Sequence, residues 1–409
     1  MSPHDPPLAP WWRPRWVRAV LADLLRDELR RLRPGAVPAV PSPVVSPDAP
    51  DASNAPDSGD PLAELALDSI ELLDLATAVS LRFGLHHHDL DRRLLAEPRL
   101  ATWAETVIEG RCRDDAYIAF FTSGSTGRPQ RCPHEMAALV QEVTHWAGQL
   151  GTPRRVLRAV PCHHIYGFLF TVMLPAQLGI DVIDVRGALP AGVLARTEPG
   201  DLLVGHPGFF ALAAADAGAA ANVRAVTSTG QCPDFVWAAL ADAGVSRVLE
   251  VYGSSECAGI GSRLSAAAPF TLLPWWIPEP GRARLLRTLG EPCIAQDRWE
   301  WVDRRRFRVH GRLDGAVQVA GENVFPGRVR DVLLTHPAVA DAAVRPFGED
   351  VAVRLKAFVV PADPDADALA LRRALDPWLA ARLRPAERPR RIDVGASLPQ
   401  TPAGKPADW

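Results

Sequence analysis

The sequence predicts a mixed α/β fold with a helical N-terminal segment, a large α/β lobe and a small α+β C-terminal lobe. Beyond about residue 111, short apolar runs such as 156–160 and 247–251 alternate with helical patterns, as in a layered α/β domain. A loop rich in glycine and hydroxyl residues, 121–129, follows the apolar run 116–121, and α/β proteins hold phosphates at such strand ends. Before residue 110, apolar residues recur with helical spacing instead.

Composition excludes several classes of protein. A chain of 409 residues predicts two or three domains, and a net charge of −3 offers no basic surface for nucleic acid. The sequence shows neither a leader peptide nor an apolar run of about 18 residues, so we expect a soluble cytoplasmic protein without a membrane span. The six cysteines are widely spaced and form no Cys-x-x-Cys pair, which predicts neither a zinc site nor a disulfide framework and suits a reducing cytosol.

The N-terminal segment is expected to begin with a disordered tail, residues 1–14. Residues 16–32 have apolar residues at helical spacing with charges on the opposite side, which predicts an amphipathic helix. Residues 34–60 are rich in proline, serine and aspartate and indicate a long loop. A final helix of this segment is expected over residues 100–107.

Another helix is predicted over residues 69–83, because Asp68 can cap its start and Gly84 can end it. A long helix, a long loop and Asp-Ser-Ile-Glu opening a further helix resemble an acyl carrier protein, a four-helix bundle that would span residues 15–110. The resemblance implies that Ser69 carries 4′-phosphopantetheine, whose phosphodiester would lie at the positive end of the helix dipole.

That resemblance implies two protein partners, a phosphopantetheinyl transferase and a downstream biosynthetic enzyme that meets the carrier. The alternative is that Ser69 merely belongs to the cap of an ordinary helix, where an Asp-Ser pair is common. The loop over residues 34–60 is longer than is usual for a carrier protein.

The glycine-rich loop and the motifs after it resemble, in the same order, those of the adenylate-forming superfamily, which includes acyl- and aryl-CoA synthetases and peptide-synthetase adenylation domains. The later motifs are 251–256 (Val-Tyr-Gly-Ser-Ser-Glu), Asp297, 311–321 (opening Gly-Arg-Leu-Asp) and 398–405 (ending Gly-Lys). The resemblance implies a large lobe over residues 111–310 and a small, mobile lobe over residues 311–409. The short large lobe is similar to acid–AMP ligases of aryl-polyene pathways.

The resemblance also implies that the chain uses ATP and Mg²⁺ to convert a carboxylic acid into an acyl-adenylate. The glycine-rich loop would hold the β- and γ-phosphates through Thr122, Ser123, Gly124, Ser125, Thr126 and Gly127. The later motifs would place Tyr252 on adenine, Asp297 on the ribose, Ser255 at the α-phosphate, Glu256 at Mg²⁺, and Gly230, Gly253 and Arg312 at the nucleotide. Gln130 stands where the family usually has a lysine.

Lys405 is the strongest catalytic candidate, and Glu256 and Ser255 are the others. Lys405 resembles the family's terminal lysine, which reaches the carboxylate and α-phosphate oxygens, and a compact ammonium on a flexible stem suits that transient contact. Asp314 resembles the hinge residue about which the small lobe turns between adenylation and thiol transfer.

The segment over residues 160–168 indicates the class of acid. Relatives that activate amino acids have an aspartate there for the α-ammonium, but this segment has no acidic residue, and a buried ammonium without a counter-charge is disfavoured. His164 and Tyr166, with Gly230, are expected to border a planar or apolar acid. The alternative is that His164 and Tyr166 simply pack in the core of the lobe.

Three functions are compatible with these patterns. The leading one is a self-loading ligase of secondary metabolism that adenylates an aryl or compact apolar acid and transfers it to the thiol on Ser69. The second is an acyl-CoA synthetase or a ligase that acts on a separate carrier protein. The third is a degenerate binding protein without catalysis, which the retained Glu256, Asp297 and Lys405 argue against.

Overall fold

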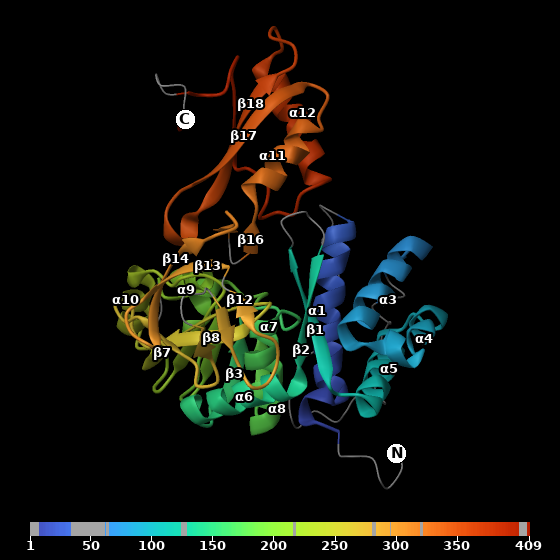
Figure 1. Cartoon of the computed structure of the whole chain (residues 1–409), viewed down its shortest axis with the longest axis vertical. Helices are drawn as coiled ribbons and strands as arrows, with labels where there is room; N and C mark the ends of the chain where they lie inside the picture. The colour runs from blue at the N-terminus through green and yellow to red at the C-terminus, as the bar shows by residue number, and fades with distance from the viewer. Residues whose placement is uncertain are drawn as a thin grey trace. The chain divides into compact units, whose positions relative to one another are not determined.

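The computed structural model describes residues 8–33, 62, 65–123, 129–215, 218–279, 284–294, 296–319, 322–400 and 407–409 (Figure 1). It contains two compact units: the large one ends at His310, and the small one holds the chain from Gly311 onwards. The expected mixed α/β fold with a small C-terminal lobe is confirmed. Within the described ranges, no helix is both long and apolar enough to cross a bilayer.

The large unit is built on a nine-stranded sheet with the order β13-β14-β9-β8-β7-β6-β5-β3-β4 among the described residues. Adjacent strands are parallel from β4 to β7, and these are β4 (Asp181–Asp184), β3 (Arg155–Arg158), β5 (Leu202–Gly205), β6 (Arg224–Thr227) and β7 (Arg247–Ser254). The other strands are β8 (Ala258–Arg263), β9 (Phe270–Leu272), β13 (Asp297–Trp301) and β14 (Arg306–Arg312). The predicted strands of the parallel half are confirmed.

Helices connect the parallel strands, because a parallel pair needs a crossover connection. They are α7 (Ile165–Phe168), α8 (Leu174–Leu178), α9 (Pro207–Ala213) and α10 (Asp234–Asp242), and α6 (Met136–Leu150) precedes β3. Leu202, Leu203 and Val204 of β5 are 0% exposed. This burial on both faces explains why the strand is a continuous apolar run instead of an alternating one.

Helix α1 (Pro14–Leu32) lies in the core of the large unit. Its residues Trp16, Leu21 and Leu25 are at most 1% exposed, and even Asp23, on the expected polar side, is 2% exposed. The predicted helix is therefore confirmed, but Asp23 on its polar side is buried in the protein, whereas Arg30 and Arg31 at its end are exposed. The expected carrier bundle over residues 15–110 is not seen as a separate body in the described residues, because α1 packs into the large unit.

A small cluster of helices follows, formed by α3 (Ser69–Phe83), η2 (Leu85–His88), α4 (Asp91–Ala96) and α5 (Leu100–Arg113). The predicted cap of α3 is confirmed: Asp68 accepts the N–H groups of Ile70 and Glu71 at 2.8 Å, and Gly84 ends the helix. This cluster also contacts the large unit's core, because buried Arg82 donates a hydrogen bond to the His163 carbonyl.

A two-stranded hairpin, β1 (Tyr117–Ser123) and β2 (Pro129–Glu135), follows α5. It confirms the strand predicted before the glycine-rich loop. The loop itself, residues 124–128, lies outside the described residues.

A small three-stranded sheet of the large unit contains β10 (Ile277–Pro278), β11 (Arg284–Leu286) and β12 (Cys293–Ile294). Cys293 forms a disulfide bond with Cys257, with 5.3 Å between the Cα atoms. The prediction that the cysteines form no disulfide is therefore wrong for this pair. The two cysteines are 36 positions apart in the sequence. They come close only when the protein folds, so their spacing does not predict the bond.

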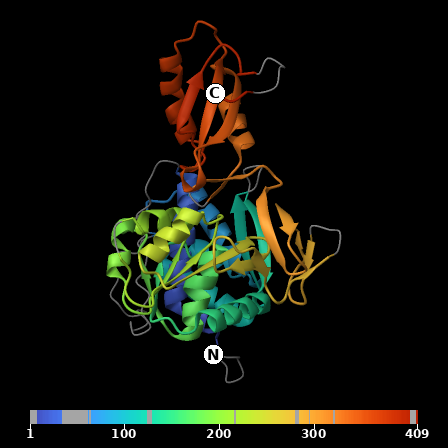
Figure 2. The ribbon, with the colours of Figure 1, turned by 90° about the vertical axis from the view of Figure 1, so that its left-hand side faces the viewer.

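The small unit has a three-stranded sheet of β17 (Val339–Phe347), β18 (Arg354–Pro361) and β19 (Arg391–Val394), in that order. Figure 2 shows α11 (Pro326–Leu334) and α12 (Ala368–Ala380) against one face of this sheet, and a hairpin of β15 (Val317–Val319) and β16 (Glu322–Val324) precedes them. Val329, Leu333, Leu355 and Leu375, all 0% exposed, form the centre of its core. Helices and strands thus combine here as in the small α+β lobe that the sequence predicts.

Candidate functional site

Two residues expected to bind the nucleotide, Tyr252 and Asp297, are brought into direct contact. Tyr252 lies on β7 and Asp297 begins β13, and the tyrosine hydroxyl donates to Asp297 Oδ2 at 2.5 Å. Trp299 Nε1 donates to the same hydroxyl at 2.8 Å. This chain of hydrogen bonds fixes the direction of the Asp297 carboxylate and the plane of the tyrosine ring.

The ring of Tyr252 rests on an aromatic cluster. Its centroid lies 5.5 Å from that of Phe270 and 5.6 Å from that of Phe307, and these two rings are 4% and 0% exposed. Trp299 contacts Tyr252 edge-on at 6.3 Å. The cluster supports Tyr252 from the protein interior while the residue remains half-buried, so a planar group has access to it.

The turn after β7 holds Ser255 and Glu256, both half-buried. Gly253 is required just before it, because a Cβ at that position would lie 2.2 Å from the Ala258 carbonyl oxygen. His134 of β2 also holds the turn, because its Nε2 lies 2.7 Å from the Ser255 carbonyl oxygen. Burial lowers the pKa of His134 to about 4, so the neutral ring donates this hydrogen bond through Nε2–H.

A second support is Glu142 of α6, which is 0% exposed. Both of its oxygens accept the Gly259 N–H at 3.1 Å, and Trp146 Nε1 donates to Oε1 at 3.1 Å. Burial raises the pKa of Glu142 to about 7. Sequence reasoning missed both His134 and Glu142. The available signal was a glutamate between Leu139 and Trp146, among the apolar residues of the segment that forms α6.

The loop after β6 carries the candidate Gly230, which is half-buried. Thr229 beside it has φ 75°, a conformation that β-branched residues rarely adopt. The hydroxyls of Thr227 and Thr229 are buried and have no hydrogen-bond partner among the described residues. Strain and unpaired polar atoms concentrate at binding sites, which makes this loop a candidate for contact with a polar ligand.

The two residues expected at the acid have different surroundings. His164 is exposed and immediately precedes α7, and its side chain makes no capping hydrogen bond to the helix. Tyr166 is 8% exposed, and its hydroxyl lies within hydrogen-bond distance of the carbonyls of Gly205 and Val226, at 3.0 and 2.8 Å. Tyr166 therefore ties the ends of β5 and β6 together, as in the alternative that it packs in the core.

The remaining candidates are Arg312 and Asp314 of the small unit, Thr122 of the large unit, and residues that are not described. Arg312 Nε donates to Asp314 Oδ1 at 2.8 Å, and this hydrogen bond lowers the pKa of Asp314. Thr122 is half-buried on β1. Outside the described residues, or without a described side chain, are Ser123, Gly124, Ser125, Thr126, Gly127 and Lys405.

No group of three or more histidine, cysteine or acidic residues suited to a metal occurs in the described part of the chain. Mg²⁺ needs only one or two carboxylates beside phosphate oxygens.

The chain is similar to known proteins along most of its length. The profile of the AMP-binding enzymes matches residues 52–327, and that of the AMP-binding enzyme C-terminal domain matches residues 329–405. A 4-coumarate–CoA ligase of Halorhodospira halophila is 38% identical over 341 residues, which are 83% of this chain and 87% of the relative. A 4-coumarate–CoA ligase of Rhodobacter capsulatus is 35% identical over 405 residues, which are 96% of this chain and 100% of the relative.

A solved structure resembles the chain as well. An amide bond synthetase of Marinactinospora thermotolerans matches it with a TM-score of 0.62 at 19% identity, over 96% of this chain and 92% of that one. At this identity the likeness shows the fold alone.

Proposed function

The chain belongs to the AMP-binding enzymes of the adenylate-forming superfamily, and from this premise we propose that it is an acid–CoA ligase for 4-coumarate or a closely related aryl acid. The observation that carries the proposal is the similarity to a 4-coumarate–CoA ligase over 96% of this chain and 100% of that relative. In this reaction a carboxylate oxygen attacks the α-phosphorus of ATP, pyrophosphate leaves, and the thiol of CoA then displaces AMP.

The residues around Tyr252 fit the nucleotide of such a reaction. The half-buried ring of Tyr252 offers a face to adenine, and the Asp297 carboxylate, oriented by the tyrosine hydroxyl, would accept the ribose hydroxyls. Glu256 lies on the adjoining turn and would contribute one oxygen to Mg²⁺, which neutralises phosphate charge when bound. His134 holds the Ser255 carbonyl and Glu142 holds the Gly259 N–H on β8, just after the turn, so we assign both residues a positioning role.

The segment after β3 fits an aryl acid. His164 is exposed beside α7, and it carries no negative charge that would pair with an ammonium group. We propose that the His164 side chain borders the acid, and that Tyr166 contributes at most the face of its ring because its hydroxyl is bound to main-chain carbonyls.

The test is a substrate panel with purified protein, ATP, Mg²⁺ and CoA. The acids are 4-coumaric, cinnamic, benzoic and 4-hydroxybenzoic acids, a fatty acid and proteinogenic amino acids, and thioester formation is followed by absorbance and mass. We expect 4-coumaric acid to give the highest kcat/KM. A preference for an amino acid or a fatty acid would refute the assignment.

Lys405→Ala tests the proposed chemistry in the same assay. Losing a cation that acts mainly in the transition state lowers a rate by about 10²–10³-fold, and we expect a loss of that size in pyrophosphate exchange. Arg373→Ala, which removes an exposed cation of the same unit, is the matched control and should retain the wild-type rate. Exchange by Lys405→Ala within a few-fold of wild type would remove Lys405 from the mechanism.

A second candidate function, transfer of the acid to a phosphopantetheine arm on this chain, is favoured by one observation. Ser69 is exposed at the first turn of α3, beside the apolar side chains of Ile70 and Leu73, which are 72% and 51% exposed. Burial of α1 in the large unit counts against a separable carrier.

Intact mass distinguishes the two candidates. Incubation with a phosphopantetheinyl transferase and CoA should add one arm to the wild type and none to Ser69→Ala if Ser69 is a carrier site. If the wild type gains no mass but forms the thioester of free CoA, only the CoA ligase remains of the two candidate functions.

A further inference from the structure

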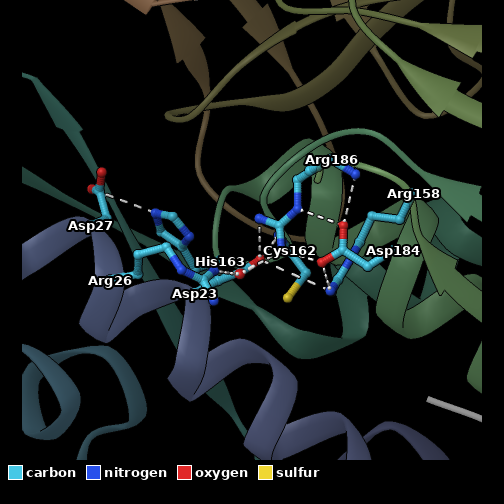
Figure 3. Close-up of polar contacts among 8 residues, drawn as sticks. All are labelled: Asp23, Arg26, Asp27, Arg158, Cys162, His163, Asp184 and Arg186. Atoms are coloured by element: carbon cyan, nitrogen blue, oxygen red, sulfur yellow. Dashed lines mark hydrogen bonds and ion pairs between the residues drawn. The ribbon is translucent and has the colours of Figure 1, made fainter. Parts of the chain in front are cut away.

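A cluster of charges, of which Asp23 and Arg158 are buried and Asp184 and Arg186 half-buried, joins α1 to the carboxyl ends of β3 and β4 (Figure 3). Asp23 of α1 is 2% exposed, and Arg158, the last residue of β3, is 1% exposed. Arg186 donates to the two oxygens of Asp23 at 2.8 and 3.0 Å, and Arg158 lies 4.0 Å from the same carboxylate. Asp184, at the end of β4, accepts from Arg158 at 2.8 Å and from Arg186 at 2.9 Å.

The charges of this cluster stabilise one another. Burial alone would raise the pKa of Asp23, but Arg158, Arg186 and His163 outweigh it and hold that pKa well below the usual range. Asp23 is therefore ionised at neutral pH. Because removing one partner of a buried pair leaves an uncompensated charge, the cluster fixes α1 against the sheet.

The same carboxylate reaches the loop that leads from β3 to α7. Asp23 Oδ2 accepts the N–H of Cys162 at 2.8 Å. The next residue, His163, is held on two further sides, because its carbonyl accepts a hydrogen bond from Arg82 and its ring lies 3.5 Å from Asp27. Three contacts from α1 and α3 thus fix the two residues that precede His164.

The loop that leads from β3 to α7 is also fixed by a close contact with α7 itself. A Cβ on Gly167 would lie 1.9 Å from the carbonyl oxygen of Pro161, so the helix packs directly on the loop backbone. The ring of His164 packs on that of His163, with 4.1 Å between the centroids, so the contacts that hold Cys162 and His163 also set the position of the His164 side chain.

We propose that Asp23 is a positioning residue for acid binding, which sets the place of His164 through the N–H of Cys162. The inference rests on the proposed function, in which His164 borders the acid. It assigns α1 a role in substrate selection, although α1 itself supplies no residue to the acid. The same contacts place the N-terminal helices among the supports of the site.

The test compares two variants whose side chains have a similar branched shape but differ in polarity. Asp23→Leu and Asp23→Asn are each made in an Arg186→Met background, which removes one charge of each sign and substitutes side chains of similar volume. Only the asparagine retains an oxygen that can accept the Cys162 N–H. KM values for the acid and for ATP, and kcat, are measured with the acid that the wild type prefers.

We expect the Asp23→Leu variant to have a KM for the acid about tenfold above that of the Asp23→Asn variant, the size of losing one buried hydrogen bond, and a KM for ATP within twofold. Equal acid KM values, or acid and ATP KM values that rise together, would overturn the proposal.

Hydrogen exchange supplies a readout that needs no substrate and no variant. Cys162 lies outside every helix and strand, yet its amide should exchange slowly in the wild type because Asp23 accepts its N–H. Exchange at the rate of exposed loop amides would reject the positioning role even if the protein activates 4-coumarate. Slow exchange in a protein that activates no aryl acid would instead reject the proposed function, and the link to acid binding would fall with it.

Discussion

Glu142→Gln should change how the stability of the large unit depends on pH. Glu142 is 0% exposed and accepts hydrogen bonds from Gly259 and Trp146, and burial raises its pKa from 4.5 to about 7. The folded protein therefore binds this proton more tightly than the unfolded chain. The contribution of Glu142 to stability is fully present below pH 4.5 and is lost as the pH rises through 7.

The size of the effect follows from the two pKa values. One pKa unit corresponds to about 1.4 kcal/mol, so the rise from 4.5 to about 7 makes the wild type about 3 kcal/mol less stable at pH 8 than it would be without this titration. Glutamine keeps an oxygen for the Gly259 and Trp146 donors and has no charge to bury. The stability of the variant relative to wild type should rise by about 3 kcal/mol from acid to alkaline pH, or roughly 5 °C in melting temperature.

Thermal unfolding from pH 5 to pH 8 measures this difference. Glu135→Gln is the matched control, because it removes the same charge at the half-buried start of the same helix and leaves Glu142 in place with its Gly259 and Trp146 donors. If the Glu142→Gln curve also runs parallel to wild type over this range, Glu142 is not a buried group that titrates near neutrality, and the role assigned to it beneath the Glu256 turn fails.

Three other perturbations test the site. Gly167→Ala should destabilise the large unit by about 1–3 kcal/mol because its Cβ would meet the Pro161 carbonyl, whereas Gly148→Ala, with no atom within 4 Å of the added Cβ, should be neutral or stabilising in the same melting assay. Tyr252→Phe removes the donor to Asp297 and should raise the KM for ATP about fivefold while leaving that for the acid unchanged; a changed acid KM alone would contradict the assignment. Thiol titration of the unfolded, unreduced chain should find the free cysteines 112, 132, 162 and 232 and give two more thiols after reduction, and full reactivity before reduction would exclude the Cys257–Cys293 bridge.

Local pattern was sufficient to predict much of the fold and part of the site. The cap at Asp68, the end of α3 at Gly84 and the parallel strands follow from rules that act over a few residues. Tyr252 and Asp297 were predicted separately from motifs, and the structure brings them to 2.5 Å. The hydrogen bond between them was not predictable, because it depends on how β13 joins the sheet.

The errors have a common physical origin in long-range contacts. The polar side of α1 was expected to face water, but Asp23 faces Arg186, which is 163 positions away. A helix with a polar side has the same sequence pattern whether water or buried arginines cover that side. The Cys257–Cys293 pair was missed for the same reason, and the packing of Tyr166 against β5 and β6 was considered only as the alternative.

A charge in a largely apolar helix nevertheless carries information. Asp23 follows Val20, Leu21 and Ala22 and precedes Leu24, and a carboxylate in such a run must find partners if the helix is buried, because an unpaired charge in the core costs several kcal/mol. The sequence thus indicates that a partner exists without naming it. In this chain one partner, Arg158, ends β3, and the other, Arg186, follows the end of β4. An open α/β sheet binds its ligands at these strand ends, so the requirement to pair the charge of Asp23 places α1 beside the site. The buried carboxylates of α1 and α6 are for this reason better guides to the supports of the site than the exposed polar residues around them.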